Sequence, residues 1–354
     1  MSSLLLPYTK SSSPRSGTGL SSLNSHSKGA LVFSVRPEVS VLYSSHAGTV
    51  CDSCYSSRIS HKCGLCPSYS LCGACAAPER RLAARHEEGE CKKYGAVPAE
   101  LRRGDTDYLR WFLRYFDLRE RQAQQERETK KRATETTKLE TTPGGVVGVV
   151  GVVGVVTDRC PFSGLVSLDS LQSASNVAWS ESFAALFVKH CSPPPSVTSK
   201  DIVRLLHVLR VNDLGFPYAG SATLGWALSS AACLMNHSCD PTVAVRVGEG
   251  GAMEIEAVRD VREGEELTIS YLDLLDPAHA AVAGRRAALK EKYLFSCNCS
   301  RCVEQASKKP VQVKIVVPPG AGAGDVLSVV VEGEERRVSV PDGAVEGQEL
   351  LVTL

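Results

Sequence analysis

The sequence has almost no net charge and has little that would direct it to a membrane. Among 354 residues, 40 Lys and Arg stand against 39 Asp and Glu, a formal net charge of +1. This balance disfavours a protein that binds nucleic acid or a membrane surface through a general basic excess. The repeated Gly-Val-Val run at 144–156 has 13 residues, whereas a bilayer-spanning helix needs roughly 20. The first residues carry three consecutive leucines with no basic segment before them, so we expect no secretory signal.

Cysteine, by contrast, is abundant and clustered. Seven of the 14 cysteines lie within 51–91 and three more within 297–302. Close CxxC pairs without a secretory signal indicate metal binding in a reducing compartment, so we expect a zinc protein of the cytoplasm or the nucleus. Three further thiols, Cys160, Cys191 and Cys233, show no ligand spacing and are expected to be ordinary side chains.

The first cluster has enough ligands for two tetrahedral zinc sites. Each CxxC turn can place two thiolates on one ion, and a segment with so few large apolar side chains needs zinc to fold. His61 competes with His86 for one ligand position. The expected ligands are Cys51, Cys54, Cys63, Cys66, Cys72, Cys75, His86 and Cys91.

A second group of polar residues follows in the last third of the chain. Asn236-His237-Ser238-Cys239-Asp240-Pro241 by itself fits a polar turn as well as a site. However, the later trio Cys297, Cys299 and Cys302 is one thiolate short of a closed tetrahedral site, and Cys239 can supply it. That closure would bring Tyr271, at the end of a predicted strand, close to Asn236 and His237.

Taken in order, these motifs closely resemble the SET-and-MYND protein-lysine methyltransferases, over roughly residues 13–305. The cysteine cluster resembles a MYND zinc finger, with two departures: two residues rather than three separate Cys72 from Cys75, and four rather than three separate His86 from Cys91. The segments that resemble the SET domain are Gly17-Thr18-Gly19-Leu20, Arg210-Val211-Asn212, Asn236–Pro241, Glu265–Tyr271 and the CxCxxC at Cys297.

The resemblance implies three zinc ions, with interleaved ligands in the finger. Cys51, Cys54, Cys72 and Cys75 would bind the first ion, and Cys63, Cys66, His86 and Cys91 the second. The third would be bound by Cys239, Cys297, Cys299 and Cys302.

The resemblance also implies methyl transfer from S-adenosylmethionine to the ε-amine of lysine in a histone or another protein. Tyr271 would be the catalytic tyrosine. The cofactor would be bound by Gly17, Gly19, Asn212, Asn236, His237 and Phe295. The alternative is a catalytically weak adaptor whose finger binds proline-rich peptides; a RING-like ubiquitin ligase shares interleaved zinc ligands but has no use for the Tyr271 strand.

We therefore expect an α+β protein: a β-rich SET fold with an inserted MYND double-zinc finger, a helical insert, a post-SET zinc site and a small C-terminal β module. The expected parts are a flexible N-terminus 1–16, the first SET segment 17–50, the finger 51–91, the helical insert 92–211, the SET catalytic core 212–276, the post-SET region 277–305 and the repeated β module 311–354. The module repeats V-P-x-G-A-x-x-G-x-x-L-x-V from Val317 and from Val340.

Apolar periodicity predicts helices within 101–116 and 198–211, and strands at 242–247, 253–258 and 267–271. Residues 119–140 have no apolar stripe and fit either a solvated helix extension or disorder. Asp276-Pro277 predicts the start of a helix that runs to about Leu294. Arg102, Arg103, Arg110 and Arg114 alternate with acids and are expected on a solvated face.

Overall fold

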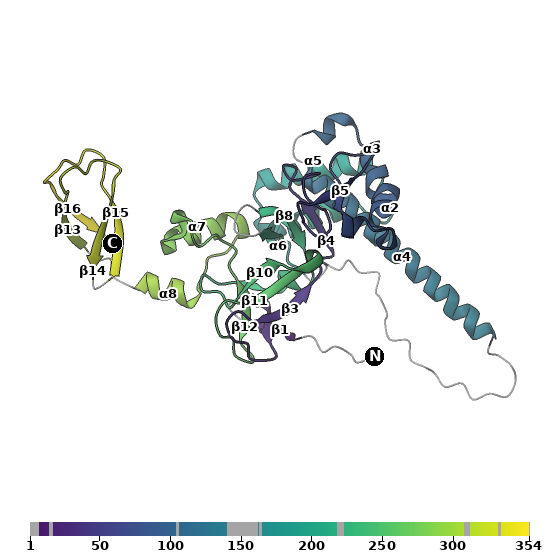
Figure 1. The fold of residues 1–354 in the computed structure, drawn as a ribbon, viewed down its shortest axis with the longest axis horizontal. Helices are drawn as coiled ribbons and strands as arrows, with labels where there is room; N and C mark the ends of the chain where they lie inside the picture. The colour runs from purple at the N-terminus through teal and green to yellow at the C-terminus, as the bar shows by residue number, and fades with distance from the viewer. Residues whose placement is uncertain are drawn as a thin grey trace. The chain divides into compact units, whose positions relative to one another are not determined.

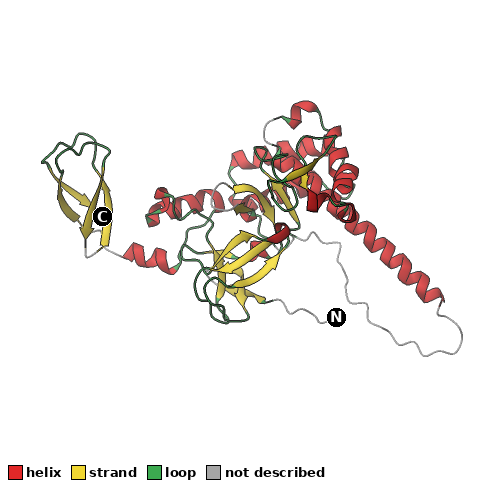
Figure 2. Cartoon of the chain, in the orientation of Figure 1, coloured by secondary structure: helices red, strands yellow, loops and turns green. Residues whose placement is uncertain are grey.

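The computed structural model describes residues 7–13, 17–103, 106–139, 162, 165–217, 223–307, 312–331 and 334–353. Helices and strands are mixed throughout, as expected for the α+β class (Figure 2). The chain divides into two compact units, Met1–Cys297 and Asn298–Leu354. The Gly-Val-Val segment 144–156 lies outside the described residues, as does Cys160. None of the described helices has the length and apolar character needed to cross a membrane.

The first unit contains small sheets, and one of them brings the SET motifs together. The sheets have the strand orders β1-β2-β12-β9, β10-β11-β3, β4-β8-β7 and β5-β6. Residues 8–13, expected in a flexible lead-in, instead form a strand because their backbone pairs with β2. The strands are β1 (Tyr8–Ser13), β2 (Gly17–Ser22), β3 (Leu31–Val35), β4 (Val39–Leu42), β5 (Ile59–Lys62), β6 (Ser70–Cys72), β7 (Leu214–Pro217), β8 (Thr223–Leu228), β9 (Asn236–His237), β10 (Val243–Val247), β11 (Met253–Ala257) and β12 (Glu266–Ile269).

The helices of this unit are α1 (Gly73–Ala76), α2 (Leu82–His86), α3 (Lys92–Ala96), α4 (Asp107–Leu139), α5 (Ala174–Cys191), α6 (Ser199–Asn212) and α7 (Val282–Tyr293). Helices α1 to α5 lie in and beside the finger, whereas α7 lies apart from it (Figure 1). The strands predicted at 242–247 and 253–258 are confirmed as β10 and β11, and the helix predicted at 198–211 is confirmed as α6. Helix α5 was not predicted.

Helix α4 is one continuous element. It includes residues 119–139, so the helical extension, rather than disorder, is present there, and this distal part projects away from the sheets (Figure 1). Its first turns carry the aromatic core: the ring centroid of Phe112 lies 5.4 Å from those of Phe183 and Phe187 on α5.

The prediction of a solvated basic face is wrong for Arg110 and Arg114, whose side chains are only 1% and 15% exposed. Their positions alternate with acids, but the carboxylates that pair with Arg114 come from the finger, which a helical pattern does not reveal.

The single helix predicted for 276–294 is interrupted. Asp276 caps a 3₁₀ turn at Pro277–His279, and α7 begins only at Val282. The buried guanidinium of Arg285 donates to the carbonyl oxygens of His279 and Ala280. The break itself lies at Ala281, whose backbone is extended (φ −84°, ψ 150°) rather than helical.

The second unit contains α8 (Ser300–Ser307) and two antiparallel strand pairs. The pairs are β13 (Gln312–Val316) with β16 (Glu349–Thr353), and β14 (Val326–Val331) with β15 (Glu334–Ser339). The two copies of the repeat have the same structure: Val317 and Val340 are both buried, at 0% and 2% exposure. Gly324 and Gly347 occupy the same repeat position with φ of 89° and 77°, a conformation that side chains with a Cβ rarely adopt.

Candidate functional site

The cysteines and His86 form three groups that could each hold a metal ion. In each group the four ligand atoms lie within 4.8 Å of one another. His61 lies on β5 and belongs to none of the groups. The groups, which match those that the resemblance implies, are Cys51, Cys54, Cys72 and Cys75; Cys63, Cys66, His86 and Cys91; and Cys239, Cys297, Cys299 and Cys302.

The spacing of the sulfur atoms fits zinc. A tetrahedral ion with Zn–S bonds of about 2.3 Å separates two thiolates by roughly 3.8 Å. The Sγ atoms of Cys54 and Cys72 lie 3.5 Å apart, and those of Cys63 and Cys91 3.6 Å apart. Cys239 Sγ lies 3.9 Å from Cys297 Sγ. Since four protein ligands close a tetrahedral zinc site, these sites are structural rather than catalytic.

The two central SET motifs meet because β9 and β12 pair in parallel. Thr268 is opposite Asn236, and Ile269 is opposite His237. This register places Tyr271, two residues beyond the end of β12, beside His237: the Tyr271 backbone N–H donates to His237 Nδ1 at 2.9 Å. The proximity of Tyr271, Asn236 and His237 that closure by Cys239 predicts is therefore present.

His237 joins this site to the third cysteine group. Because its Nδ1 accepts the Tyr271 N–H, the ring proton of a neutral imidazole lies on Nε2, which is 3.2 Å from Cys239 Sγ. An N–H donated to a zinc ligand orients that ligand. The position of Tyr271 is thus linked by two hydrogen bonds to a thiolate of the zinc site.

The Tyr271 side chain is nearly buried and its hydroxyl has a defined partner. The hydroxyl donates to the Met235 carbonyl oxygen at 2.7 Å. Burial raises the pKa of Tyr271, so the phenol stays protonated at neutral pH. The ring lies 4.8 Å from that of Tyr293 and 6.4 Å from that of Phe295.

A cavity of about 480 Å³ opens beside these rings. Tyr271, Tyr293, Asp213 and Lys292 are among its lining residues. Lys292 Nζ lies 3.6 Å from Asp213 Oδ1 and 4.9 Å from the centroid of the Tyr293 ring. Its aromatic walls and single ion pair are compatible with a channel for a long, amphipathic side chain.

Of the predicted cofactor residues, Gly19 has the clearest structural requirement. A Cβ at Gly19 would lie 2.6 Å from Asn236 Nδ2 and 2.7 Å from Glu266 Oε1. Asn236 Nδ2 itself donates to Glu266 Oε1 at 2.8 Å and to the Thr18 carbonyl oxygen at 3.3 Å. Gly19 thus allows β2 to approach Asn236 closely. Gly17 begins the same strand.

Asn212 lines the same cavity as Tyr271, but its side-chain amide is bonded to the backbone. Its Nδ2 donates to the carbonyl oxygens of Val208 and Val166, at 2.7 and 2.8 Å. The side chain therefore stabilises the C-terminal end of α6, and its role towards a cofactor stays a prediction. Phe295 is closer to the site, with its ring 6.0 Å from that of His237.

Sequence reasoning missed three residues of the site. Glu266 orients Asn236, the Met235 carbonyl accepts the Tyr271 hydroxyl, and Tyr293 forms a wall of the cavity. Glu266 lies within the segment Glu265–Tyr271 that resembles the family and Tyr293 ends the predicted helix before Cys297, but a backbone carbonyl such as that of Met235 has no sequence signal at all.

Comparison with known proteins agrees with this geometry. The family model of the SET domain matches residues 17–272, more than two thirds of the chain. N-lysine methyltransferase SMYD2 of Gallus gallus is 26% identical over 318 residues, which are 88% of this chain and 64% of the relative. SMYD2-A of Danio rerio is 27% identical over 322 residues, 87% of this chain and 63% of the relative. Histone-lysine N-methyltransferase SMYD3 of Homo sapiens is 43% identical over 82 residues, 23% of this chain and 18% of the relative.

Among solved structures, the SET domain of LSMT bound to lysine and AdoHcy covers 90% of this chain and 58% of its own, with a TM-score of 0.34 and 12% identity. The chain spans less than two thirds of the length of the first two relatives. The SET match includes β2, β9, β12 and Tyr271, the elements that build the site, and encloses the finger with its two ligand groups. The chain belongs to the SET domain family and has the SET-and-MYND arrangement.

Proposed function

We propose that the protein transfers a methyl group from S-adenosylmethionine to the ε-amine of a lysine in a protein substrate. The observation that carries the proposal is the contact between the Asn236-His237 strand and Tyr271, at the edge of the 480 Å³ cavity. The cofactor would supply a methyl group on a positively charged sulfur, which is already a good electrophile. Asn236, His237, Gly19 and Phe295 surround the position where we expect it to bind.

The Tyr271 hydroxyl would orient the amine. Since it donates its proton to the Met235 carbonyl oxygen, its own lone pairs remain acceptors for an N–H of the lysine. The hydrogen bond from the Tyr271 backbone to His237 and the packing against Tyr293 limit the movement of the ring. Alignment of this kind is a large share of the catalysis available to an in-line transfer.

The amine must also lose its proton. A lysine with a pKa near 10.4 costs roughly 4–5 kcal/mol to deprotonate at pH 7. Enclosure in the cavity, whose lining includes Leu214, Val243 and Ile269, would disfavour the charged form and reduce this cost. No residue in this proposal acts as a strong base.

The test is transfer of labelled methyl groups from S-adenosylmethionine into the proteins of a lysate, followed by mass spectrometry of the modified lysines. We expect Tyr271→Phe to lower the rate about 100-fold, because an oriented polar contact to the reacting group is lost. Zinc content should stay at the wild-type value. Tyr94→Phe, which removes a hydroxyl from the finger, is the matched control and should be fully active. A fully active Tyr271→Phe variant would refute the assigned role.

The competing function is an adaptor that binds proline-rich peptides through the finger and has weak activity or none. It would be favoured if the wild-type protein neither transfers label nor binds S-adenosylmethionine. We further propose that the protein works in the cytoplasm or the nucleus, since clustered thiols with the spacing of metal ligands are typical of a reducing compartment. Fluorescence microscopy of the tagged full chain tests this location.

A further inference from the structure

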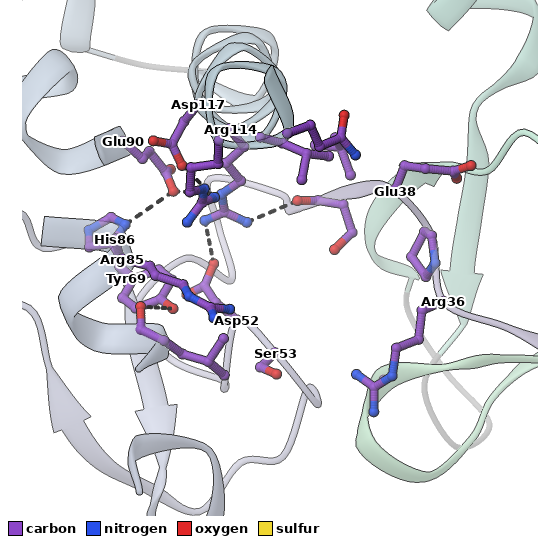
Figure 3. A pocket seen from close by; sticks show the side chains of 18 of the residues that line it. Arg36, Glu38, Asp52, Ser53, Tyr69, Arg85, His86, Glu90, Arg114 and Asp117 are labelled. Carbon is purple, nitrogen blue, oxygen red and sulfur yellow. Dashed lines mark hydrogen bonds and ion pairs between the residues drawn. The ribbon is translucent and has the colours of Figure 1, made fainter. Parts of the chain in front are cut away.

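One buried guanidinium connects three separate parts of the first unit. Arg114, on α4, donates from Nε to Glu90 Oε2 at 2.8 Å and from Nη2 to Asp52 Oδ1 at 2.7 Å. Its Nη1 donates to the carbonyl oxygen of Ser40 on β4 at 2.9 Å. Figure 3 shows Arg114 reaching from the helix towards the finger, along a cavity of about 410 Å³. Asp52 and Glu90 are the more deeply buried partners, with side chains 1% and 8% exposed.

Glu90 links Arg114 to a zinc ligand, His86. Its Oε2, which accepts from Arg114, also accepts from His86 Nδ1 at 3.1 Å. This fixes the tautomer of His86 with Nε2 free for the metal, and Nε2 lies 3.2 Å from Cys66 Sγ. The imidazole stacks on Tyr69, with ring centroids 3.8 Å apart and planes 2° apart. Its orientation is therefore determined by one ring and one carboxylate.

The unusual spacing between His86 and Cys91 has a structural use. Residues Glu87–Cys91 form a π-helical turn, which accommodates the additional residue. The turn places Glu90 directly against His86, and it packs so closely on α4 that a Cβ at Gly89 would collide with the Asp117 carboxylate. Two independent contacts, at Gly89 and at Glu90, thus join the second half of the finger to α4.

We propose that Arg114 is a positioning residue of the second zinc site: by holding Glu90 it orients His86, so that a helix outside the finger sets how tightly the finger retains this zinc. The first site has four thiolates and no imidazole, and the hydrogen bonds of Arg114 described above go to Glu90, Asp52 and Ser40 rather than to those cysteines. The effect should therefore be confined to the site of Cys63, Cys66, His86 and Cys91. The proposal does not depend on methyl transfer.

Lysine cannot replace Arg114 in this role. The three bonds leave three nitrogens of one planar group in different directions, towards Glu90, Asp52 and Ser40. An ammonium is a compact charge on a flexible stem and does not reproduce that geometry. Arg114→Lys should therefore behave like a loss of the contact rather than like the wild type.

The experiment measures zinc release from the full-length protein to a chromogenic chelator. In Arg114→Met and Arg114→Lys, we expect one of three zincs to leave about 10–100-fold faster, the usual effect of losing such a partner. The other two should leave at wild-type rates. The matched control is Lys93→Met: Lys93, on α3 directly after the finger, pairs through Nζ with Glu120 Oε2 on α4 at 2.8 Å, and this ion pair includes neither a zinc ligand nor Glu90. It should release zinc as the wild type does.

Arg114→Met leaves two carboxylates buried without their cation and can fail to fold, so Glu90→Met provides the decisive variant. It removes the oxygen that accepts from His86 and Arg114, keeps a side chain of similar size, and leaves the bonds from Arg114 to Asp52 and Ser40 in place. Faster release of one zinc, together with a changed ligand-field spectrum of one site after cobalt substitution, would support the proposal. Wild-type release and an unchanged spectrum in Glu90→Met would overturn it. Accelerated zinc release in Lys93→Met would also overturn the proposal, because the effect would then follow from losing any contact with α4.

Discussion

Replacing Gly19 by alanine should weaken binding of S-adenosylmethionine while leaving the zinc sites intact. The added Cβ would lie 2.6 Å from Asn236 Nδ2 and 2.7 Å from Glu266 Oε1, well inside the 3.4 Å of ordinary contact. The Glu266 carboxylate ends a flexible side chain and can turn away. Asn236 lies on β9 and moves less freely, because its strand pairs with β12.

The size of the effect follows from the contacts that must change. If the Asn236 amide moves, it loses the bonds to Glu266 at 2.8 Å and to the Thr18 carbonyl at 3.3 Å. Each such bond contributes about 0.5–1.5 kcal/mol, so the cost is about 1–3 kcal/mol. If this cost destabilises the arrangement of Asn236 that binds the cofactor, the dissociation constant for S-adenosylmethionine rises about 5–150-fold.

Isothermal titration calorimetry with S-adenosylmethionine measures this change, with zinc content and thermal unfolding recorded on the same samples. Gly95→Ala is the control, since a Cβ at Gly95 in α3 meets nothing within 4 Å. Wild-type affinity in a folded Gly19→Ala protein would refute the reasoning, because close approach to Asn236 would then not be what Gly19 provides.

Two further predictions concern stability and are checked by urea unfolding at neutral pH. Trp111→Ala should destabilise the protein by about 3–5 kcal/mol, since the side chain is 0% exposed and packs on Tyr115 and Trp226. Trp111→Phe should cost clearly less, because it keeps an aromatic ring beside Tyr115 and Trp226 while it removes a buried indole N–H that has no partner among the described residues; equal losses would contradict this account. Thr198→Ala removes the capping box with Asp201 at the start of α6 and should cost about 0.5–2 kcal/mol, and an unchanged unfolding midpoint would show that the cap is dispensable.

Much of the site was accessible from local sequence patterns. Zinc ligands have short, characteristic spacings because one ion must be reached from one or two tight turns, and all three groups of the structure contain the expected residues. Helix α6 was equally readable, since its apolar face and its Thr198 cap are both local features. The parallel pairing of β9 with β12 could be inferred only indirectly, from the ligand that Cys239 supplies to the later cysteines.

The errors have a common physical cause. Arg110 and Arg114 were expected in solvent because their neighbours along the helix are charged. The burial of Arg114 depends on Asp52 and Glu90, which are far away in the sequence, and that of Arg110 on the distant Leu42 carbonyl in addition to the nearby Asp107.

The sequence by itself determined which side chains can bind metal, where several of the regular elements form and which family the motifs resemble, because spacing and periodicity act over a few residues. Only the tertiary structure decided which guanidinium holds Glu90, which carbonyl receives the Tyr271 hydroxyl and why Gly19 has no side chain. Those outcomes depend on hydrogen bonds and close contacts between segments that are distant in the chain. Such contacts leave no local pattern, since each depends on how the strands and helices pack.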